Sequence, residues 1–194
     1  LVQYANFDWV KLLPKSIVVG IANVDRRRDF TYPTTIQKDK QDFPTTGGSE
    51  KFIRFIENEL QPFIEKKYNT NGKNMLIGQS LGGLLAAEIL VKKPTLFSSY
   101  VIISPSFWWD NESLLKAAKT QIALPANTSV YVGVGNEGKT MVNDAKQLVK
   151  ILKGANANTA FHYFKKENHA TIFHLAVYDA FVNFDTMAKA AVKN

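Results

Sequence analysis

Short apolar runs recur along the chain, and longer segments rich in helix formers separate them. Runs of this kind are typical of parallel strands that are buried on both faces. The alternation of strands and helices predicts an α/β protein, with a mostly parallel sheet covered by helices on both faces. The expected strands are 16–20, 75–79, 99–103, 129–134 and 159–164.

Helical periodicity is clearest over residues 50–68, where aromatic and aliphatic side chains recur on one face. Ser49 is placed to cap this helix, and Pro62 should bend it because proline has no amide hydrogen to donate. We expect loops over 21–33 and 34–49. Other predicted helices are the end of one over 1–13, then 83–90, 111–119, 140–152 and a terminal helix through Phe184.

The composition indicates an ordinary globular protein. Of 194 residues, 45% are hydrophobic and 21% are charged, and we expect a single domain over 1–194. No apolar run reaches the roughly twenty residues of a membrane span. The net charge is +7, but the lysines are dispersed and no basic–aromatic cluster suggests nucleic acid. The absence of cysteine excludes a disulfide framework, a thiol nucleophile and a Cys-based zinc site, and we expect no cofactor.

One stretch, residues 74–90, carries the strongest chemical signal. An apolar strand runs directly into Gly78-Gln79-Ser80-Leu81-Gly82, and a helix follows without a spacer. A serine on so sharp a strand-to-helix turn has its hydroxyl pushed out above the sheet, and glycine suits the crowded positions 78 and 82. The amide of Leu81, at the start of the helix, is the expected oxyanion donor. The alternative is a glycine-rich turn without catalytic meaning.

A serine nucleophile needs a base within hydrogen-bond reach. His169 lies in the loop after the last strand, at the same sheet edge as Ser80, and is the predicted base. His162 falls inside a strand and His174 in the last helix, where structural roles are expected. The alternative for His169 is an exposed loop histidine.

The imidazole in turn needs a carboxylate to orient it and to stabilise its charged form. Glu137 follows the penultimate strand at the same edge and is the first candidate. Asp144, on the next helix, is the weaker candidate, and Glu167 is too local to His169 to orient it. The order serine, acid, histidine is that of α/β-hydrolases.

Candidate substrate contacts come from two further strand ends and from Gln79. Arg26, Arg27 and Arg28 follow strand 16–20 and could bind an anion or a carbonyl group, although one of them could pair with Asp25 or Asp29 instead. Trp108 and Trp109 follow strand 99–103. One tryptophan can pack inward while the other lines a cleft for an aromatic or acyl group, or both can serve packing.

The sequence resembles the putative-esterase (esterase D-like) branch of the α/β-hydrolase superfamily, which includes siderophore trilactone esterases. The resemblance implies serine esterase chemistry with Ser80 as nucleophile and His169 as base, supports Glu137 less firmly, and suggests that Arg26 and Arg28 face the substrate cleft. The matching stretches, in chain order over most of the sequence, are 17–33, 47–68, 77–83, 103–111, 130–137 and 167–172.

The family pattern includes further strands before the point that matches Leu1. One of them is an apolar strand ending in Leu-Asp-Gly or similar, whose loop supplies the second oxyanion amide, and nothing like it occurs here. The chain therefore resembles the C-terminal part of a longer domain. The compartment and oligomeric state stay open, although the resemblance slightly favours a periplasmic or secreted protein.

Three hypotheses remain at this point. The first is a serine carboxylesterase that acts through an acyl-enzyme on Ser80. The second is a hydrolase specialised for siderophore trilactones, since the positive charge, the arginines and the tryptophans would suit an anionic, catechol-rich substrate. The third is a non-catalytic, hydrolase-like binding domain or an inactive fragment.

Overall fold

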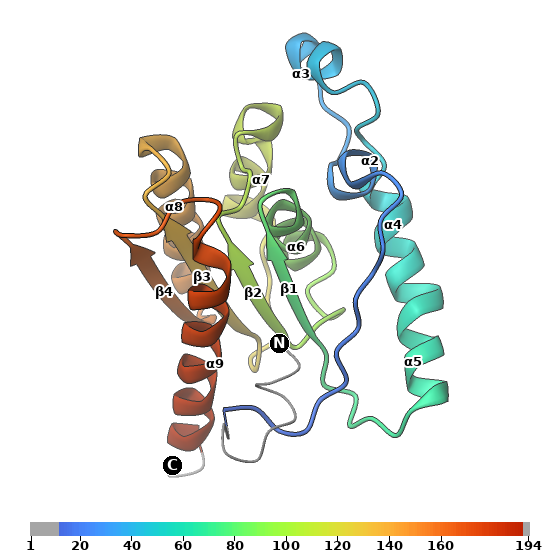
Figure 1. Cartoon of the computed structure of the whole chain (residues 1–194), viewed down its shortest axis with the longest axis vertical. Helices are drawn as coiled ribbons and strands as arrows, with labels where there is room; N and C mark the ends of the chain where they lie inside the picture. Colours follow the sequence, from blue (N-terminus) through green and yellow to red (C-terminus); the bar gives the residue numbers. More distant parts are fainter. Residues whose placement is uncertain (1–11, 192–194) are drawn as a thin grey trace.

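The structure is a computed structural model that describes residues 12–191. Within that range, parallel strands form one sheet in the order β1–β2–β3–β4, as the alternating pattern predicts (Figure 1). The observed bounds agree with the predicted strands to within a residue or two. The strands are β1 Met75–Gln79, β2 Ser99–Ile103, β3 Ser129–Gly135 and β4 Asn158–Phe164.

The strand register brings the functional loops together at one edge of the sheet. Gln79 at the end of β1 pairs with Ile103 at the end of β2, and Ile103 pairs with Gly133 of β3. β3 and β4 continue in register for two further residues, to Gly135 and Phe164. Because all strands run in the same direction, the segments that follow them leave from the same edge, where α/β proteins place their ligands.

Helices cover both faces of the sheet, as expected (Figure 1). On one face, Tyr100, Ile102 and Val132 pack in a core with α6, α7 and α8, and on the other, Val101 and Tyr131 pack against α9. Burial on both faces explains why the strands are apolar runs rather than alternating ones. The helices are α6 Leu81–Lys92, α7 Ser113–Gln121, α8 Lys139–Gly154 and α9 Ile172–Ala191.

The predicted helix over 50–68 is present, and Pro62 distorts it. It consists of α4 Ser49–Phe55, a π-helical segment Ile56–Leu60 and α5 Gln61–Lys67. Since Pro62 has no amide hydrogen and its ring crowds the preceding turn, the ladder widens just before it.

The predicted capping role of Ser49 is wrong. The N-cap position is Gly48, and no side chain caps the helix there. The Ser49 hydroxyl is buried without a hydrogen-bond partner, while its amide donates to the carbonyl of Thr31 at 3.0 Å. The helix begins one residue earlier than the sequence predicts, at Ser49, whose amide finds its partner outside the helix.

The predicted strand 16–20 is also wrong. Ser16–Gly20 is irregular and joins no ladder within the described residues. Ile17, Val18 and Val19 are 46%, 43% and 43% exposed. The β-branched run has strand propensity, but a strand forms only beside a partner. The helix predicted over 1–13 falls almost entirely outside the described residues.

The two predicted loops between 21 and 49 each contain a short helix. These are α2 Arg26–Phe30 and α3 Gln37–Asp42. The carboxylate of Asp25 begins α2 by accepting hydrogen bonds from the amides of Arg27 and Arg28 at 3.0 and 3.1 Å. A further short helix, the 3₁₀ helix η2 Trp109–Glu112, directly precedes α7. Within residues 12–191, no helix has the length and apolar character to cross a membrane.

Candidate active site

Ser80 sits on a strained turn between β1 and α6, as the motif predicts. Its backbone has φ 60° and ψ −122°, a region that side chains rarely adopt. A Cβ on Gly78 would lie 2.1 Å from the carbonyl oxygen of Gly82, and one on Gly83 would lie 2.9 Å from that of Ile103. A Cβ on Gly82 would meet only Phe30, at 3.8 Å. The turn therefore requires glycine at 78 and 83, and crowding at 82 was predicted wrongly.

Backbone hydrogen bonds fix the serine turn against the neighbouring strand end. The Ser80 amide donates to the carbonyl of Ile103 at 3.1 Å, and the Ser106 amide donates to the Ser80 carbonyl at 3.2 Å. The Ser80 and Ser106 hydroxyls lie 3.4 Å apart. Leu81 is the first residue of α6, so its amide has no partner within the helix. That amide can donate a hydrogen bond to a negatively charged oxygen that forms beside Ser80.

His169 and Glu137 form a close pair at the same sheet edge. Nδ1 of His169 lies 2.5 Å from Oε2 of Glu137. The Glu137 side chain is only 5% exposed, whereas that of His169 is 47% exposed. A buried carboxylate on Nδ1 leaves Nε2 as the nitrogen available to a substrate or nucleophile.

The other oxygen of Glu137 is held by two donors. The Ser104 hydroxyl donates to Oε1 at 2.5 Å, and the Gly135 amide donates to the same oxygen at 3.1 Å. A side chain on Gly135 would collide with Oε1 and with the carbonyl of Glu167, each 2.8 Å from its Cβ. Glycine at 135 therefore allows Glu137 to fold back over the end of β3.

The loop that carries His169 is tied to the nucleophile turn through Gln79. The side-chain amide of Gln79 donates to the carbonyl oxygen of His169 at 2.7 Å. The loop after β4 crosses the top of β3 before α9 begins, so a residue distant in the sheet reaches the β1 end (Figure 1). The structure records no hydrogen bond between the Ser80 hydroxyl and the His169 ring among the described residues. The Ser80 oxygen has its contact with Ser106 instead.

The side chains of the other two candidate acids, Asp144 and Glu167, have no recorded hydrogen bond to His169 among the described residues. Asp144 of α8 is 4% exposed, and its Oδ2 has no hydrogen-bond partner. Burial, with a smaller contribution from the negative charge of Glu112, raises the pKa of Asp144 to about 6. Glu167 contributes its backbone carbonyl, which accepts from the Asn136 amide at 2.7 Å. Of the three acids weighed from the sequence, Glu137 is the one the structure pairs with His169.

The other histidines lie away from this pair. Nδ1 of His162 lies 3.1 Å from Asp179, which also accepts a hydrogen bond from the Tyr131 hydroxyl at 2.7 Å. These contacts join β3, β4 and α9. His174, in the first turns of α9, has its ring centroid 5.8 Å from that of Phe173.

Of the three adjacent arginines, Arg28 is engaged by its neighbour. Its guanidinium donates to both carboxylate oxygens of Asp29, at 2.7 and 3.1 Å. Arg26 is exposed. Arg27 instead places its guanidinium carbon 5.2 Å from the centre of the Phe43 ring. Arg27 is thus the arginine that lies beside an aromatic ring, and the suggestion that Arg26 and Arg28 face the substrate cleft stays a prediction.

The adjacent tryptophans differ in burial, and a substrate cleft lined by Trp108 stays a prediction. Trp109 is 1% exposed and donates its indole N–H to the Tyr32 carbonyl at 2.9 Å. Trp108 is 40% exposed, and its ring lies 5.9 Å from that of Phe43. Arg27, Phe43 and Trp108 therefore form an aromatic–cationic surface. Trp108 follows Ser106 by two residues in the chain.

A buried carboxylate, Asp110, anchors this surface. Its Oδ1 accepts from the Thr34 hydroxyl at 2.8 Å and the Thr35 amide at 2.7 Å. Burial by itself raises the pKa of Asp110, but hydrogen bonds from Ser113, Thr35 and Thr34 outweigh it and leave the pKa below its ordinary value. The segment between α2 and α4 is therefore fixed to η2 by an ionised group.

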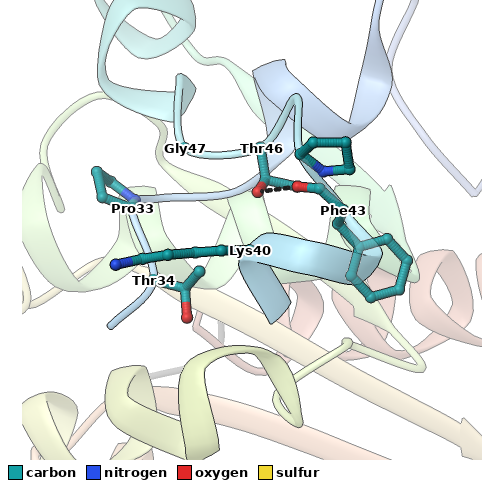
Figure 2. Close-up of a pocket in the computed structure, with 7 residues that line it drawn as sticks. Pro33, Thr34, Lys40, Phe43, Thr46 and Gly47 are labelled. Carbon is teal, nitrogen blue, oxygen red and sulfur yellow. Dashed lines mark hydrogen bonds between the residues drawn. The ribbon is translucent and has the colours of Figure 1, made fainter. Parts of the chain in front are cut away.

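Phe43 also lines a small pocket. It has a volume of about 180 Å³ and lies between α3 and the segments on either side of it (Figure 2). The Thr46 hydroxyl closes its wall by donating to the Phe43 carbonyl at 2.6 Å. None of Ser80, Glu137 and His169 lines it. Its lining residues are Pro33, Thr34, Lys40, Phe43, Pro44, Thr46 and Gly47.

Sequence reasoning missed the two serines that follow β2. Ser104 and Ser106 contact Glu137 and Ser80 respectively, and both are almost completely buried. Their place after a strand that ends at the same edge as Ser80 was a usable signal, but serine is also an ordinary turn residue. Within the described part of the chain, no cluster of three or more His, Asp or Glu side chains could hold a metal ion.

The architecture is that of an α/β-hydrolase fold. It combines a parallel sheet, a serine on a strained strand-to-helix turn, and a histidine–carboxylate pair at the same edge of the sheet. The chain belongs to the esterase family, whose model is described as "putative esterase" and matches residues 9–184. It is 34% identical to ferri-bacillibactin esterase BesA of Bacillus subtilis, over 84% of this chain and 64% of that protein.

Solved structures give the same assignment. The BES protein from Bacillus cereus is 34% identical, with a TM-score of 0.71 over 82% of this chain and 63% of that one. An IroE-like serine hydrolase from Shewanella oneidensis is 27% identical, with a TM-score of 0.84 over 95% of this chain and 64% of that one. The chain thus spans about 63–64% of the length of these relatives.

Proposed function

We propose that the protein hydrolyses carboxylic esters through an acyl-enzyme on Ser80. The observation that carries the proposal is the 2.5 Å contact between His169 and a buried Glu137, in a loop that Gln79 ties to the nucleophile turn. Esterase family membership and the serine hydrolase relatives support it. The strained backbone of Ser80 supports the nucleophile role, because such strain persists where function requires it.

In the proposed reaction, Nε2 of His169 takes the proton of the Ser80 hydroxyl as Oγ attacks the ester carbonyl carbon. The Leu81 amide donates to the oxyanion that forms. The bond to the alcohol then breaks, and His169 returns the proton to the leaving oxygen. Water attacks the acyl-enzyme, His169 takes its proton, and Ser80 leaves with that proton, so the products are one carboxylic acid and one alcohol.

In this scheme Glu137 stabilises the imidazolium that appears twice in each cycle. The Ser80–Ser106 contact represents the resting position of the hydroxyl, and a rotation about the side-chain bond of Ser80 must precede proton transfer. Catalytic hydrogen bonds commonly form only when substrate is bound.

The test is hydrolysis of p-nitrophenyl acetate and butyrate by the wild-type protein, Ser80→Ala and His169→Gln. We expect each substitution to lower kcat by at least about a thousandfold, because a triad acts as a unit. Ser98→Ala, at the other end of β2, is the matched control and should retain activity. Unchanged hydrolysis by Ser80→Ala would contradict the nucleophile role of Ser80, and no hydrolysis by well-folded wild-type protein would favour a non-catalytic domain.

A narrower function, hydrolysis of a siderophore lactone, has one specific observation in its favour. The exposed surface of Arg27, Phe43 and Trp108 could bind an anionic aromatic group by cation–π and stacking contacts. BesA, a relative that this chain matches, is named a ferri-bacillibactin esterase. The net charge of +7 is also compatible with an anionic substrate.

Kinetics separate the narrow function from the general one. A lactone specialist should show at least about tenfold higher kcat/KM on a catechol-bearing trilactone than on p-nitrophenyl butyrate, and Arg27→Gln should reduce only the former. Arg54→Gln, an exposed arginine of α4, is the control. Equal efficiency on both substrates would exclude the specialisation.

A further inference from the structure

Ser104 adopts a backbone conformation that is unfavourable for serine. It follows β2 directly, has φ 43° and is completely buried. A residue with a Cβ is strained in the left-handed region, and glycine would avoid that strain. A strained, buried serine at the catalytic edge indicates that its hydroxyl is required.

The contacts of the Ser104 hydroxyl show what it does in the structure. Oγ of Ser104 donates to Oε1 of Glu137 at 2.5 Å, while the Ser104 amide continues the β2–β3 ladder by donating to the Gly133 carbonyl at 2.8 Å. The backbone bond fixes where Ser104 sits, and the strained φ fixes the direction of its side chain. Together they place a donor on the face of Glu137 opposite His169.

The carboxylate is thereby held at both oxygens. Ser104 and the Gly135 amide hold Oε1, and Oε2 is left to face Nδ1 of His169 at 2.5 Å. A carboxylate held at one oxygen by a single backbone amide could rotate about its terminal bond, because that torsion is broad. Two donors, Ser104 just after β2 and Gly135 at the end of β3, restrict this rotation.

We propose that Ser104 is a positioning residue that orients Glu137 toward His169. This inference rests on the proposed function, since it assigns Ser104 a role in the same site. Ser104 does not touch the substrate or the reacting atoms. It acts through Glu137, and it explains how a buried acid just beyond the end of β3 is aligned with His169.

Two substitutions remove the hydroxyl with different backbone consequences. Ser104→Gly also relieves the left-handed strain, which offsets part of the stability lost with the hydroxyl. Ser104→Ala keeps the strain. We expect both to lower kcat by about tenfold to a hundredfold with KM changed less than about twofold, the loss expected when a charged acceptor loses one hydrogen bond. Ser98→Ala is again the matched serine control.

A double-mutant cycle tests whether Ser104 acts through Glu137. In a Glu137→Gln background, Ser104→Gly should cause less than about a twofold further loss, because the partner it orients is already absent. Equal losses in both backgrounds would overturn the inference and indicate a general packing effect. Wild-type activity in Ser104→Gly would overturn it as well.

A spectroscopic readout is independent of turnover. The Nδ1 proton of His169, held against a carboxylate, should give a far-downfield proton resonance that His169→Gln removes. Ser104→Gly should shift or broaden this resonance, while Ser98→Ala leaves it in place. An unchanged resonance in Ser104→Gly contradicts the positioning role. Hydrolysis that persists in Ser80→Ala would instead contradict the proposed function, so the two failures can be told apart.

Discussion

The side-chain amide of Gln79 donates to the backbone carbonyl of His169 at 2.7 Å, although 90 residues separate them in the chain. Gln79 is the last residue of β1 and directly precedes Ser80, while His169 lies in the loop after β4. The bond holds the loop of the proposed base beside the turn of the proposed nucleophile. Gln79 was a candidate substrate contact, but its amide nitrogen is engaged by this bond.

Replacement of Gln79 by alanine should therefore loosen the His169 loop. We expect kcat/KM for p-nitrophenyl butyrate to fall about threefold to thirtyfold, because a misplaced base lowers the fraction of productive complexes. The free energy of unfolding should change by only about 1 kcal/mol, the net value of one hydrogen bond. Gln121→Ala, at the exposed end of α7, is the control. Identical kinetics for the two variants would show that the Gln79 bond does not position the loop.

The geometry of the turn at Ser80 predicts that alanine is tolerated at one of its glycines and not at another. Gly78→Ala should prevent folding or destabilise the protein strongly, because its Cβ would lie 2.1 Å from the Gly82 carbonyl oxygen. Gly82→Ala should be tolerated, since its Cβ would meet only Phe30 at 3.8 Å. Soluble yield and thermal melting of the two variants provide the measurement. A stable Gly78→Ala protein, or failure of both, would contradict the turn geometry.

Asp144→Asn should stabilise the protein at neutral pH. The folded pKa of about 6 lies above the unfolded value of about 3.9, so the folded state binds more protons and the wild type loses stability as the pH rises between these values. Urea unfolding at pH 7.5 should show the variant more stable by about 1–3 kcal/mol, and the difference should vanish near pH 3.5.

The same variant separates the two acids that the sequence left open. Asp144→Asn should retain hydrolysis, whereas Glu137→Gln should lower kcat by about a hundredfold or more. A variant of Asp144 that is less stable than wild type at pH 7.5, or one that is inactive while folded, would show that its carboxylate has a partner or role absent from this structure.

The contribution of Asp110 to stability should depend on pH in the opposite direction to that of Asp144. Its folded pKa lies below the ordinary value, so its contribution to stability is complete above about pH 3.9 and is lost as the pH falls through the folded pKa. At pH 7, Asp110→Asn should cost about 1–3 kcal/mol and release the segment between α2 and α4. Hydrogen exchange at the Thr35 amide should rise. Asp42→Asn, an exposed partner of Lys38, should have neither effect.

The sequence was informative for the three proposed catalytic residues, although it did not single out Ser104 and Ser106, which follow β2. Ser80, Glu137 and His169 each lie just past an apolar run, and parallel strands bring such positions to one edge. The strand predicted over 16–20 failed because pairing is non-local: its residues have the right propensity but no neighbouring strand within the described chain.

Side-chain direction was the part that could not be predicted. Asp25 caps a short helix that turns Arg27 toward Phe43 and leaves Arg28 to Asp29, whereas the sequence offers three equivalent arginines. Ser104 is similar, because its role depends on a left-handed backbone that serine rarely adopts and that no local pattern announces.

The central claim is that Ser80 is a nucleophile activated by the His169–Glu137 pair. Reaction with a fluorophosphonate, followed by peptide mass spectrometry, measures this most directly, because the reagent requires an activated hydroxyl. The account predicts a single adduct on Ser80 in the wild-type protein and at least about a hundredfold slower labelling in His169→Gln. No adduct on the folded protein, or the same rate in His169→Gln, would contradict it.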